Sequence, residues 1–311
     1  MIHHLKKHTK RLVLLTLVGL VLSLLGLFSL ATSRAYTAHA IIPTSLAQQA
    51  DAKPQLNSSL AIKVLTLNAA HGRRLSYNQL FLNREEIADN LILIANEIKQ
   101  HQPDIVAIQE IDGPSFWSGG FNQVEALSQS SGYPFYRRGE HGKLNLGMFT
   151  ASSGTALLSS HKLQNPKSYA FEQTWRDNKG YVLSTIVSPI DQKKTIDIVS
   201  LHTDFLNPWI RNKQLEILKK DLQSRGNSVI IMGDFNCDFE SAVSCINEFS
   251  ASLKLKAYKV NSTGLETFPA DAPKKRLDWI LISQDLEFRT YGRLKAITSD
   301  HLGLIAEISH D

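Results

Sequence analysis

The stretch Val229-Ile230-Ile231-Met232-Gly233-Asp234-Phe235-Asn236 is the most informative part of this 311-residue chain. Its first four residues are apolar and predict a buried strand. Alternate side chains of a strand face the same way, so Asp234 and Asn236 at the exit of this strand are expected to point into one site. A carboxylate and an amide aimed at one point suit Mg²⁺ and phosphoryl oxygens. The alternative is a turn that merely follows a core strand.

Acidic, amide and imidazole residues recur at the ends of five further apolar runs. They are Asn68 after residues 62–67, Gln109-Glu110 after 105–108, His202 after 196–201, Asp278 before 279–282, and Asp300-His301 before 302–305. Each one alone is as consistent with a structural role as with a functional one. Their shared position at strand ends favours a single polar site.

In these residues the chain resembles the endonuclease/exonuclease/phosphatase superfamily. These are metal-dependent phosphoesterases that include pancreatic deoxyribonuclease, neutral sphingomyelinases and inositol-polyphosphate phosphatases. The similarity runs from about residue 61 to the C-terminus. It rests on LTLNAAHG (65–72), DIVAIQEID (104–112), GTALLSS (154–160), VSLHTDF (199–205), GDFNCD (233–238), KRLDWIL (275–281) and SDHLGL (299–304). The resemblance implies an α/β (α+β) fold, a four-layer sandwich of two mixed β-sheets flanked by helices, with the active site at one end.

Hydrophobic periodicity indicates the same fold class independently. Apolar runs of strand length dominate the chain, at 62–67, 104–108, 154–158, 181–188, 195–201, 228–232, 278–283 and 302–308. Amphipathic spacing predicts a helix over 84–100. A second helix is expected to begin at Pro208, a favoured first-turn residue, and to end at Gly226. Residues 61–311 are enough for one large catalytic domain.

The N-terminal segment, residues 1–40, has a different character. Four basic residues between positions 6 and 11 precede an uncharged, Leu-rich run of 22 residues, 12–33. A bilayer core needs about 20 apolar residues, so this run is long enough to span one. We expect an uncleaved signal anchor that holds the catalytic domain on the non-cytoplasmic side of a membrane, followed by a polar linker at 41–60. The alternative is cleavage at Ala38-His39-Ala40, which would leave a secreted or periplasmic domain.

Charge is unevenly distributed along the chain. The chain has 34 basic and 29 acidic residues, and residues 1–40 hold five of the basic ones and none of the acidic ones. The remainder is therefore neutral and offers no global bias toward duplex binding, which depends on several Lys/Arg contacts to phosphate. Three basic groups, Arg73-Arg74, Arg137-Arg138 and Lys274-Lys275-Arg276, are expected to be solvated surface features, with a local rim for a phosphate-rich ligand as the alternative.

The resemblance implies roles on the metal side of the site. Glu110 is the expected ligand of Mg²⁺ or Mn²⁺, and Asn68 and Asp300 are expected beside it. Asp234 and Asn236 are expected to orient the attacking water and to contact the phosphoryl oxygens.

The remaining site residues are basic or pair with a base. Asp278 and His301 are expected to form an acid–base pair, because a carboxylate fixes the tautomer of an imidazole and favours its cation. His202 matches the first histidine of the family. Arg211 begins an R-x-x-Q pattern found in bacterial-type members of the family. Two roles are considered for Arg211: contact with a phosphate of the substrate, or a structural hydrogen bond to the preceding loop. His71 is ambiguous, since it follows Asn68 by three residues on the expected active-site face.

These residues predict a divalent-metal-dependent phosphoesterase that hydrolyses a phosphodiester or phosphomonoester with a metal-assisted water. Two substrate classes compete: the neutral domain and the expected anchor favour a phospholipid or small phosphoester, and family frequency favours nucleic acid. A catalytically inactive, membrane-tethered binding module on the same fold is the alternative, because a fold does not establish function. Nothing in the sequence indicates an obligate oligomer. The two cysteines, Cys237 and Cys245, are too few for a disulfide framework and are expected to be free.

Overall fold

The computed structural model describes residues 15–21, 23, 61–146, 149–171, 179–189, 191–237 and 245–310. Residues 15–21 and 23 are helical. Within the described ranges no helix is both long and apolar enough to cross a membrane. Most of the predicted span and the whole of the predicted linker lie outside the described residues.

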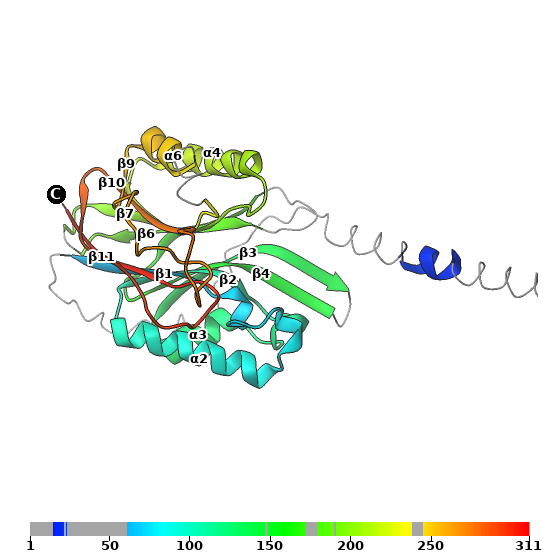
Figure 1. Cartoon of the computed structure of the whole chain (residues 1–311). Coiled ribbons are helices and arrows are strands. Elements are labelled where there is room, and N and C mark those ends of the chain that lie inside the picture. The colour runs from blue at the N-terminus through cyan, green and yellow to red at the C-terminus, as the bar shows by residue number, and fades with distance from the viewer. Residues whose placement is uncertain are drawn as a thin grey trace, which may run out of the picture.

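Two six-stranded mixed sheets pack face to face, with helices on both outer faces (Figure 1). The first sheet has the order β11-β12-β1-β2-β4-β3, and the second has the order β5-β6-β7-β8-β10-β9. The strands of the first are β1 (Ile62–Asn68), β2 (Ile105–Asp112), β3 (Phe135–Leu146), β4 (Phe149–Ser159), β11 (Leu286–Arg293) and β12 (Leu304–His310). Those of the second are β5 (Gln164–Ala170), β6 (Gly180–Val187), β7 (Thr195–His202), β8 (Ser228–Asp234), β9 (Leu255–Ala257) and β10 (Asp278–Ser283). The predicted four-layer sandwich is confirmed.

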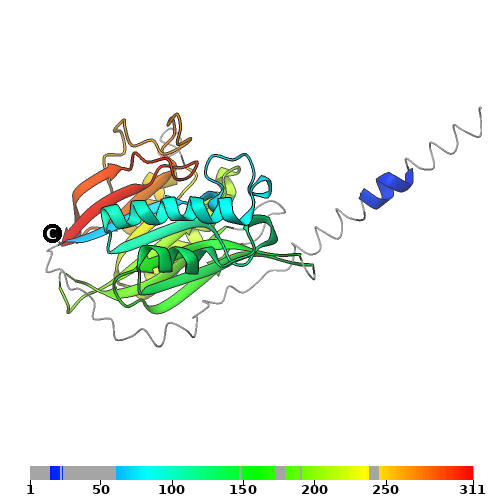
Figure 2. The ribbon, with the colours of Figure 1, turned by 90° about the horizontal axis from the view of Figure 1, so that it is seen from below.

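Among the described residues, four α-helices form the outer layers. On the first sheet lie α2 (Arg84–His101) and α3 (Gln123–Ser131), seen in front of the strands in Figure 2; on the second lie α4 (Pro208–Arg225) and α6 (Cys245–Leu253). A capping box between Asn83 and Glu86 begins α2. Pro208 begins α4, and Gly226, in the left-handed conformation, ends it. Short 3-10 turns, η2 (Ala70–Gly72), η3 (Gln79–Phe81) and η4 (Phe116–Ser118), lie in the connections of the first sheet.

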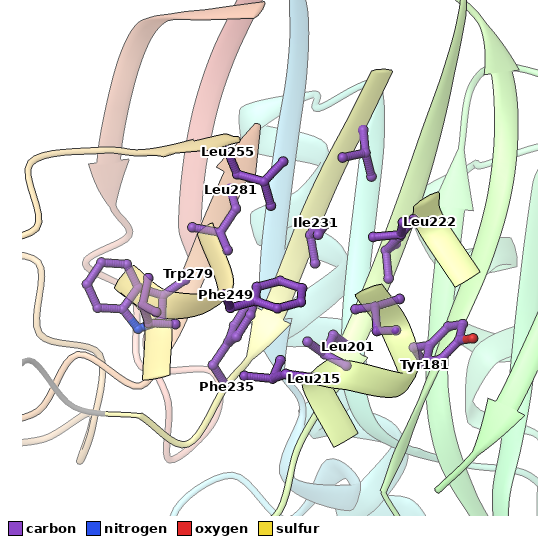
Figure 3. Close-up of a cluster of buried hydrophobic side chains, with 14 of the residues drawn as sticks. Tyr181, Leu201, Leu215, Leu222, Ile231, Phe235, Phe249, Leu255, Trp279 and Leu281 are labelled. Atoms are coloured by element: carbon purple, nitrogen blue, oxygen red, sulfur yellow. The ribbon is translucent and has the colours of Figure 1, made fainter. Parts of the chain in front are cut away.

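Strand alternation separates the apolar layers of the core. On β1, Ile62 and Val64 face the second sheet, whereas Leu65 and Leu67 face α2 and α3. The outer layer of the second sheet is shown in Figure 3, where Trp279 packs with other apolar side chains beneath α4 and α6. Full burial of each large apolar side chain contributes about 1.5–3 kcal/mol, so the layers hold the sandwich together.

The layer between the sheets changes from apolar to polar toward one end. The inward residues of β1 are Ile, Val, Thr and Asn from 62 to 68, and those of β7 are Ile, Ile, Ser and His from 196 to 202. Where the change occurs, the Gln109 amide of β2 bonds both the Thr66 hydroxyl and the Ser200 hydroxyl, at 3.2 and 3.0 Å, and so links the two sheets. Beyond this link the strands β1, β7 and β8 end in Asn68, His202 and Asp234, and these side chains belong to the site.

Candidate active site

Asp234 ends β8, and strand register places two other site residues directly beside it. It is opposite Asp278 on antiparallel β10 and opposite His202 on parallel β7. Gly233 permits this close pairing, because a Cβ there would lie 1.9 Å from the Leu201 backbone oxygen. Three residues far apart in sequence are therefore fixed side by side by the backbone of one sheet.

Two asparagines hold the Asp234 carboxylate. Asn68 Nδ2 donates to Oδ2 at 3.0 Å, and the Asn236 backbone N–H donates to Oδ1 at 2.9 Å. The side chain of Asn236 also donates to the Thr203 carbonyl at 3.0 Å. Asn236 lies beyond β8 with φ of 47°, so a turn brings it to the site, not the strand alternation that the sequence suggested. Burial raises the pKa of Asp234 to about 7.

Glu110 enters the site because β2 is irregular at this point. The pairing of β2 with β4 shifts between Ile108 and Ile111, and Glu110 has φ of 47°. Ile108 and Ile111 both pack in the layer under α2. In a regular strand a single inward-facing residue would separate two such positions. Here both Gln109 and Glu110 lie between them, so the two residues together take the place of one inward-facing residue. Regular alternation would have turned Glu110 away from the site.

Basic groups surround the Glu110 carboxylate. Lys179 Nζ lies 3.3 Å from Oε1, and His71 Nε2 lies 3.5 Å from Oε2. Burial alone would raise the pKa of Glu110, but the charges of Lys179 and His71 hold that pKa well below its ordinary value. Glu110 is therefore ionised at neutral pH, as a ligand of a hard cation must be. Sequence reasoning missed Lys179, for which the available signal was a lysine directly before a buried strand.

His301 and Asp278 form the pair expected from the sequence. His301 Nδ1 lies 2.8 Å from Asp278 Oδ2, and the Phe268 ring packs on the imidazole with centroids 4.8 Å apart. Burial lowers the pKa of an imidazole, but Asp278 and Asp234 outweigh it and raise the pKa of His301 to about 10. The second ring nitrogen, Nε2, lies 3.8 Å from Asp234 Oδ2. His301 is thus a cation whose free N–H faces the site.

His202 has the opposite electrostatic setting. Its Nδ1 lies 3.3 Å from Lys179 Nζ, and its Nε2 lies 3.4 Å from Asp234 Oδ2. Burial and the neighbouring Lys179 hold the pKa of His202 well below its ordinary value. An ammonium group only donates, so we assign the proton of neutral His202 to Nε2, which faces Asp234.

A second carboxylate–imidazole pair lies on the other side of Glu110. His71 Nδ1 is 2.8 Å from Asp112 Oδ1, while Asp112 Oδ2 accepts from Trp117 Nε1 at 2.8 Å and Ser118 Oγ at 2.6 Å. Burial lowers the pKa of His71, but Asp112 outweighs it and raises that pKa to about 9. The ambiguous His71 therefore belongs to the site. Sequence reasoning missed Asp112, although it closes the motif that contains Glu110.

Arg211 and Asp300 line the cavity, but their charged groups interact with neighbouring protein residues. Arg211 Nη1 donates to the Asp204 carbonyl at 2.7 Å, and Gln214 Oε1 accepts from the Asp204 N–H at 2.7 Å. The R-x-x-Q pattern thus holds the β7–α4 loop, which is the second of the two roles considered for Arg211. The Asp300 carboxylate forms an ion pair with Arg73.

One cavity of about 610 Å³ joins these groups. Eight of the nine predicted site residues line it, and the ninth, Asp278, lies behind His301. Among the predicted basic groups, Arg73 and Lys275 also line the cavity. The expectation of solvated arginines was wrong for two others, which are buried: Arg138 bonds a backbone carbonyl, and Arg276 stacks 3.8 Å from the Trp279 ring centre.

The donor set of the site fits a divalent cation. Asp234, Asp278 and His301 place ligand atoms within 4.8 Å of one another, and Asp278 Oδ1 is buried without a hydrogen-bond partner. Glu110 adds an ionised carboxylate in the same cavity. Oxygen donors of this kind suit Mg²⁺ and Mn²⁺.

Solved structures with a similar fold come from several organisms. An endonuclease/exonuclease/phosphatase family protein from Leptotrichia buccalis C-1013-b aligns with a TM-score of 0.62 at 22% identity, over 80% of this chain and 100% of that one. The human Nocturnin catalytic domain, solved with a sulfate anion, gives 0.60 at 23% identity, over 81% and 94%. A humanized D. rerio TDP2 gives 0.56 at 17% identity, over 81% and 100%.

No curated protein matches this sequence. A sequence profile, however, matches residues 65–301, which include every predicted site residue. The chain therefore belongs to the endonuclease/exonuclease/phosphatase family.

Proposed function

We propose that this protein is a Mg²⁺-dependent phosphodiesterase that uses water as the nucleophile. The observation that carries the proposal is the buried Asp278–His301 pair, whose imidazolium faces Asp234 in a cavity that also holds ionised Glu110. Acid–base pairs set beside a carboxylate of near-neutral pKa are typical of hydrolytic sites.

Glu110 is the residue that would hold the metal, with Asn68 and Asp300 contributing oxygens from the same cavity. When bound, the ion offsets phosphoryl charge and polarises the P–O bonds. The trio of Asp234, Asp278 and His301 is a weaker choice, because the cationic imidazole of His301 repels a metal ion.

Side chains of the protein supply the other catalytic roles: accepting a proton from water, orienting that acceptor, and donating hydrogen bonds to the phosphoryl group. Asp234, whose pKa of about 7 suits a base at neutral pH, accepts a proton from the attacking water. Asn68 and Asn236 fix its two oxygens, so its orientation does not depend on the substrate. Neutral His202 and cationic His301 donate from Nε2 to phosphoryl and leaving oxygens, where negative charge develops.

The proposal is tested by hydrolysis of bis-(p-nitrophenyl) phosphate by the purified full chain with Mg²⁺. Glu110→Ala and His301→Ala are each expected to lower kcat by about 100-fold or more, since each removes a group that acts in the transition state. His101→Ala and Glu216→Ala are matched controls away from the cavity and should retain the wild-type rate. Survival of the rate in both site variants would contradict the proposal. Absence of any turnover in the wild type would favour the inactive binding module.

A further inference from the structure

Exposed apolar side chains gather at the end of the sandwich that carries the cavity. Of fourteen large apolar residues exposed within the described part of 61–310, ten belong to three segments at this end. The segments are residues 75–81, the group of Phe116 with Leu146 and Phe149 at the β3–β4 hairpin tip, and residues 205–209 before and within the first turn of α4. We call the ten exposed apolar residues of these segments the apolar rim: Leu75, Tyr77, Leu80, Phe81, Phe116, Leu146, Phe149, Phe205, Leu206 and Trp209. In Figure 1 the η2–η3 connection, the β3–β4 hairpin and the start of α4 lie at the same end.

Side-chain contacts connect the rim to the cavity. The Tyr77 and Phe81 rings stack, and Gln79 between them lines the cavity. Phe116 contacts Phe149 edge to face, with ring centroids 5.5 Å apart, and also contacts the cavity-lining Trp117. Phe205 lines the cavity from the third segment. The rim thus borders the mouth of the site and is not scattered over the surface.

The exposure of the rim is unusual for a folded domain. Tyr77 is 91% exposed, Phe81 72% and Trp209 64%. Single exposed apolar residues are ordinary, but a patch beside a polar cavity marks an interaction surface. Its mixture of aromatic residues with basic ones, such as Lys213 with Nζ 3.6 Å from the Trp209 ring centre, is typical of proteins that lie at a membrane interface.

The chain itself indicates which surface the rim meets. Residues 12–33 are uncharged and as long as a bilayer span, and 27 residues, 34–60, separate them from the domain. A random-coil chain of 27 residues has an end-to-end distance of roughly 30 Å. With residues 12–33 in a bilayer, a distance of this order would keep the domain beside it and would allow its apolar end to turn toward the lipid.

We propose that the apolar rim docks on the lipid bilayer and that the substrate is a phosphodiester of a membrane lipid, whose headgroup enters the cavity. This deepens the proposed function and rests on it. Water adds to phosphorus and the P–O bond to the leaving alcohol breaks. The proton that water gives up to Asp234 is balanced by the proton that the leaving oxygen takes from His301.

Docking is tested directly with single labelled cysteines in the full chain, reconstituted in vesicles of phosphatidylcholine and phosphatidylglycerol. Phe81→Cys and Phe149→Cys carry an environment-sensitive fluorophore, while native Cys237 and Cys245 are buried and stay unlabelled. Val187→Cys is the matched control, because Val187 is exposed but lies at the end of β6 opposite the site. We expect a blue shift and quenching by spin-labelled lipid at positions 81 and 149 only. Equal signals at all three positions, or a shift only upon adding an oligonucleotide, would overturn the proposal.

Activity separates the docking proposal from the proposed function. The Phe81→Asp/Phe149→Asp variant should hydrolyse vesicle lipid at least about tenfold more slowly, equivalent to 1.4 kcal/mol, and soluble bis-(p-nitrophenyl) phosphate at the wild-type rate. Val187→Asp should leave both rates unchanged. If the wild type cleaves the soluble diester but no lipid, or if the rim variant cleaves lipid normally, the docking proposal is wrong. If the wild type cleaves neither substrate, the proposed function itself fails.

Discussion

His202 and His301 both face Asp234, yet they hold their protons differently. His301 has Asp278 behind its Nδ1 and is a cation, whereas His202 has the Lys179 ammonium behind its Nδ1 and is neutral. The partner at the far nitrogen therefore decides the charge of each ring. The two histidines therefore supply two different hydrogen-bond donors to the same cavity, one cationic and one neutral.

The pairing of His301 with Asp278 leads to a prediction about pH. Asp278→Asn removes the largest of the charges that raise the pKa of His301, so that pKa falls. The catalytic cation is then lost at lower pH, and the basic limb of the kcat–pH profile should move to lower pH. We expect kcat to fall by about 10²–10⁴-fold with little change in KM.

The double variant tests whether the two residues act as a unit. Asp278→Asn with His301→Ala should be little worse than His301→Ala alone. Losses that multiply independently in steady-state kinetics would contradict the pairing and assign Asp278 to the metal.

Residues at regular strand ends were predictable, and residues that depend on irregular backbone were not. Asp234, Asp278 and His202 follow from alternation along strands. Glu110 was identified only through the family motif, because a bulge and not alternation turns it inward. Lys179 was missed, since a lysine before a buried strand is a weak local signal and its contact with Glu110 forms only in the folded chain.

At the scale of elements, sequence reasoning found the interior strands and missed the edges. All eight predicted runs are strands with two neighbours, which are buried on both faces and therefore continuously apolar. The four missed strands, β3, β5, β9 and β11, are the four sheet edges. Edge strands are partly exposed and polar, so β3, with two arginines, a glutamate and a lysine, gave no apolar signal.

The β7–α4 loop allows a prediction about stability. Gln214→Ala removes the acceptor of the buried Asp204 N–H. An unsatisfied buried donor costs about 1–3 kcal/mol, and each kcal/mol lowers Tm by roughly 2–4 °C in a domain of this size. Gln223→Ala, exposed on the same helix, is the control and should leave Tm unchanged in a thermal melt. Equal Tm values for the two variants would show that the R-x-x-Q pattern does not hold the loop.

At the scale of the whole molecule, the candidate active site lies at one end of the layer between the two sheets, where the inward side chains are polar. Apolar inward residues give way to Asn68, His202 and Asp234 at the strand ends, so the sheets that form the core also position the site. The family motifs predicted this architecture and the end that carries the site. They did not predict the apolar rim, because its residues lie in separate segments of the chain that come together only in the folded structure.

Metal dependence of turnover tests the central claim most directly. The purified full chain should lose hydrolysis of bis-(p-nitrophenyl) phosphate when treated with a chelator and regain it as Mg²⁺ is added back. Glu110→Gln, which removes the ionised ligand but keeps its shape, should require more Mg²⁺ for half-maximal rate. A chelated wild-type protein that keeps its full rate, or a Glu110→Gln variant with an unchanged Mg²⁺ requirement, would contradict the account.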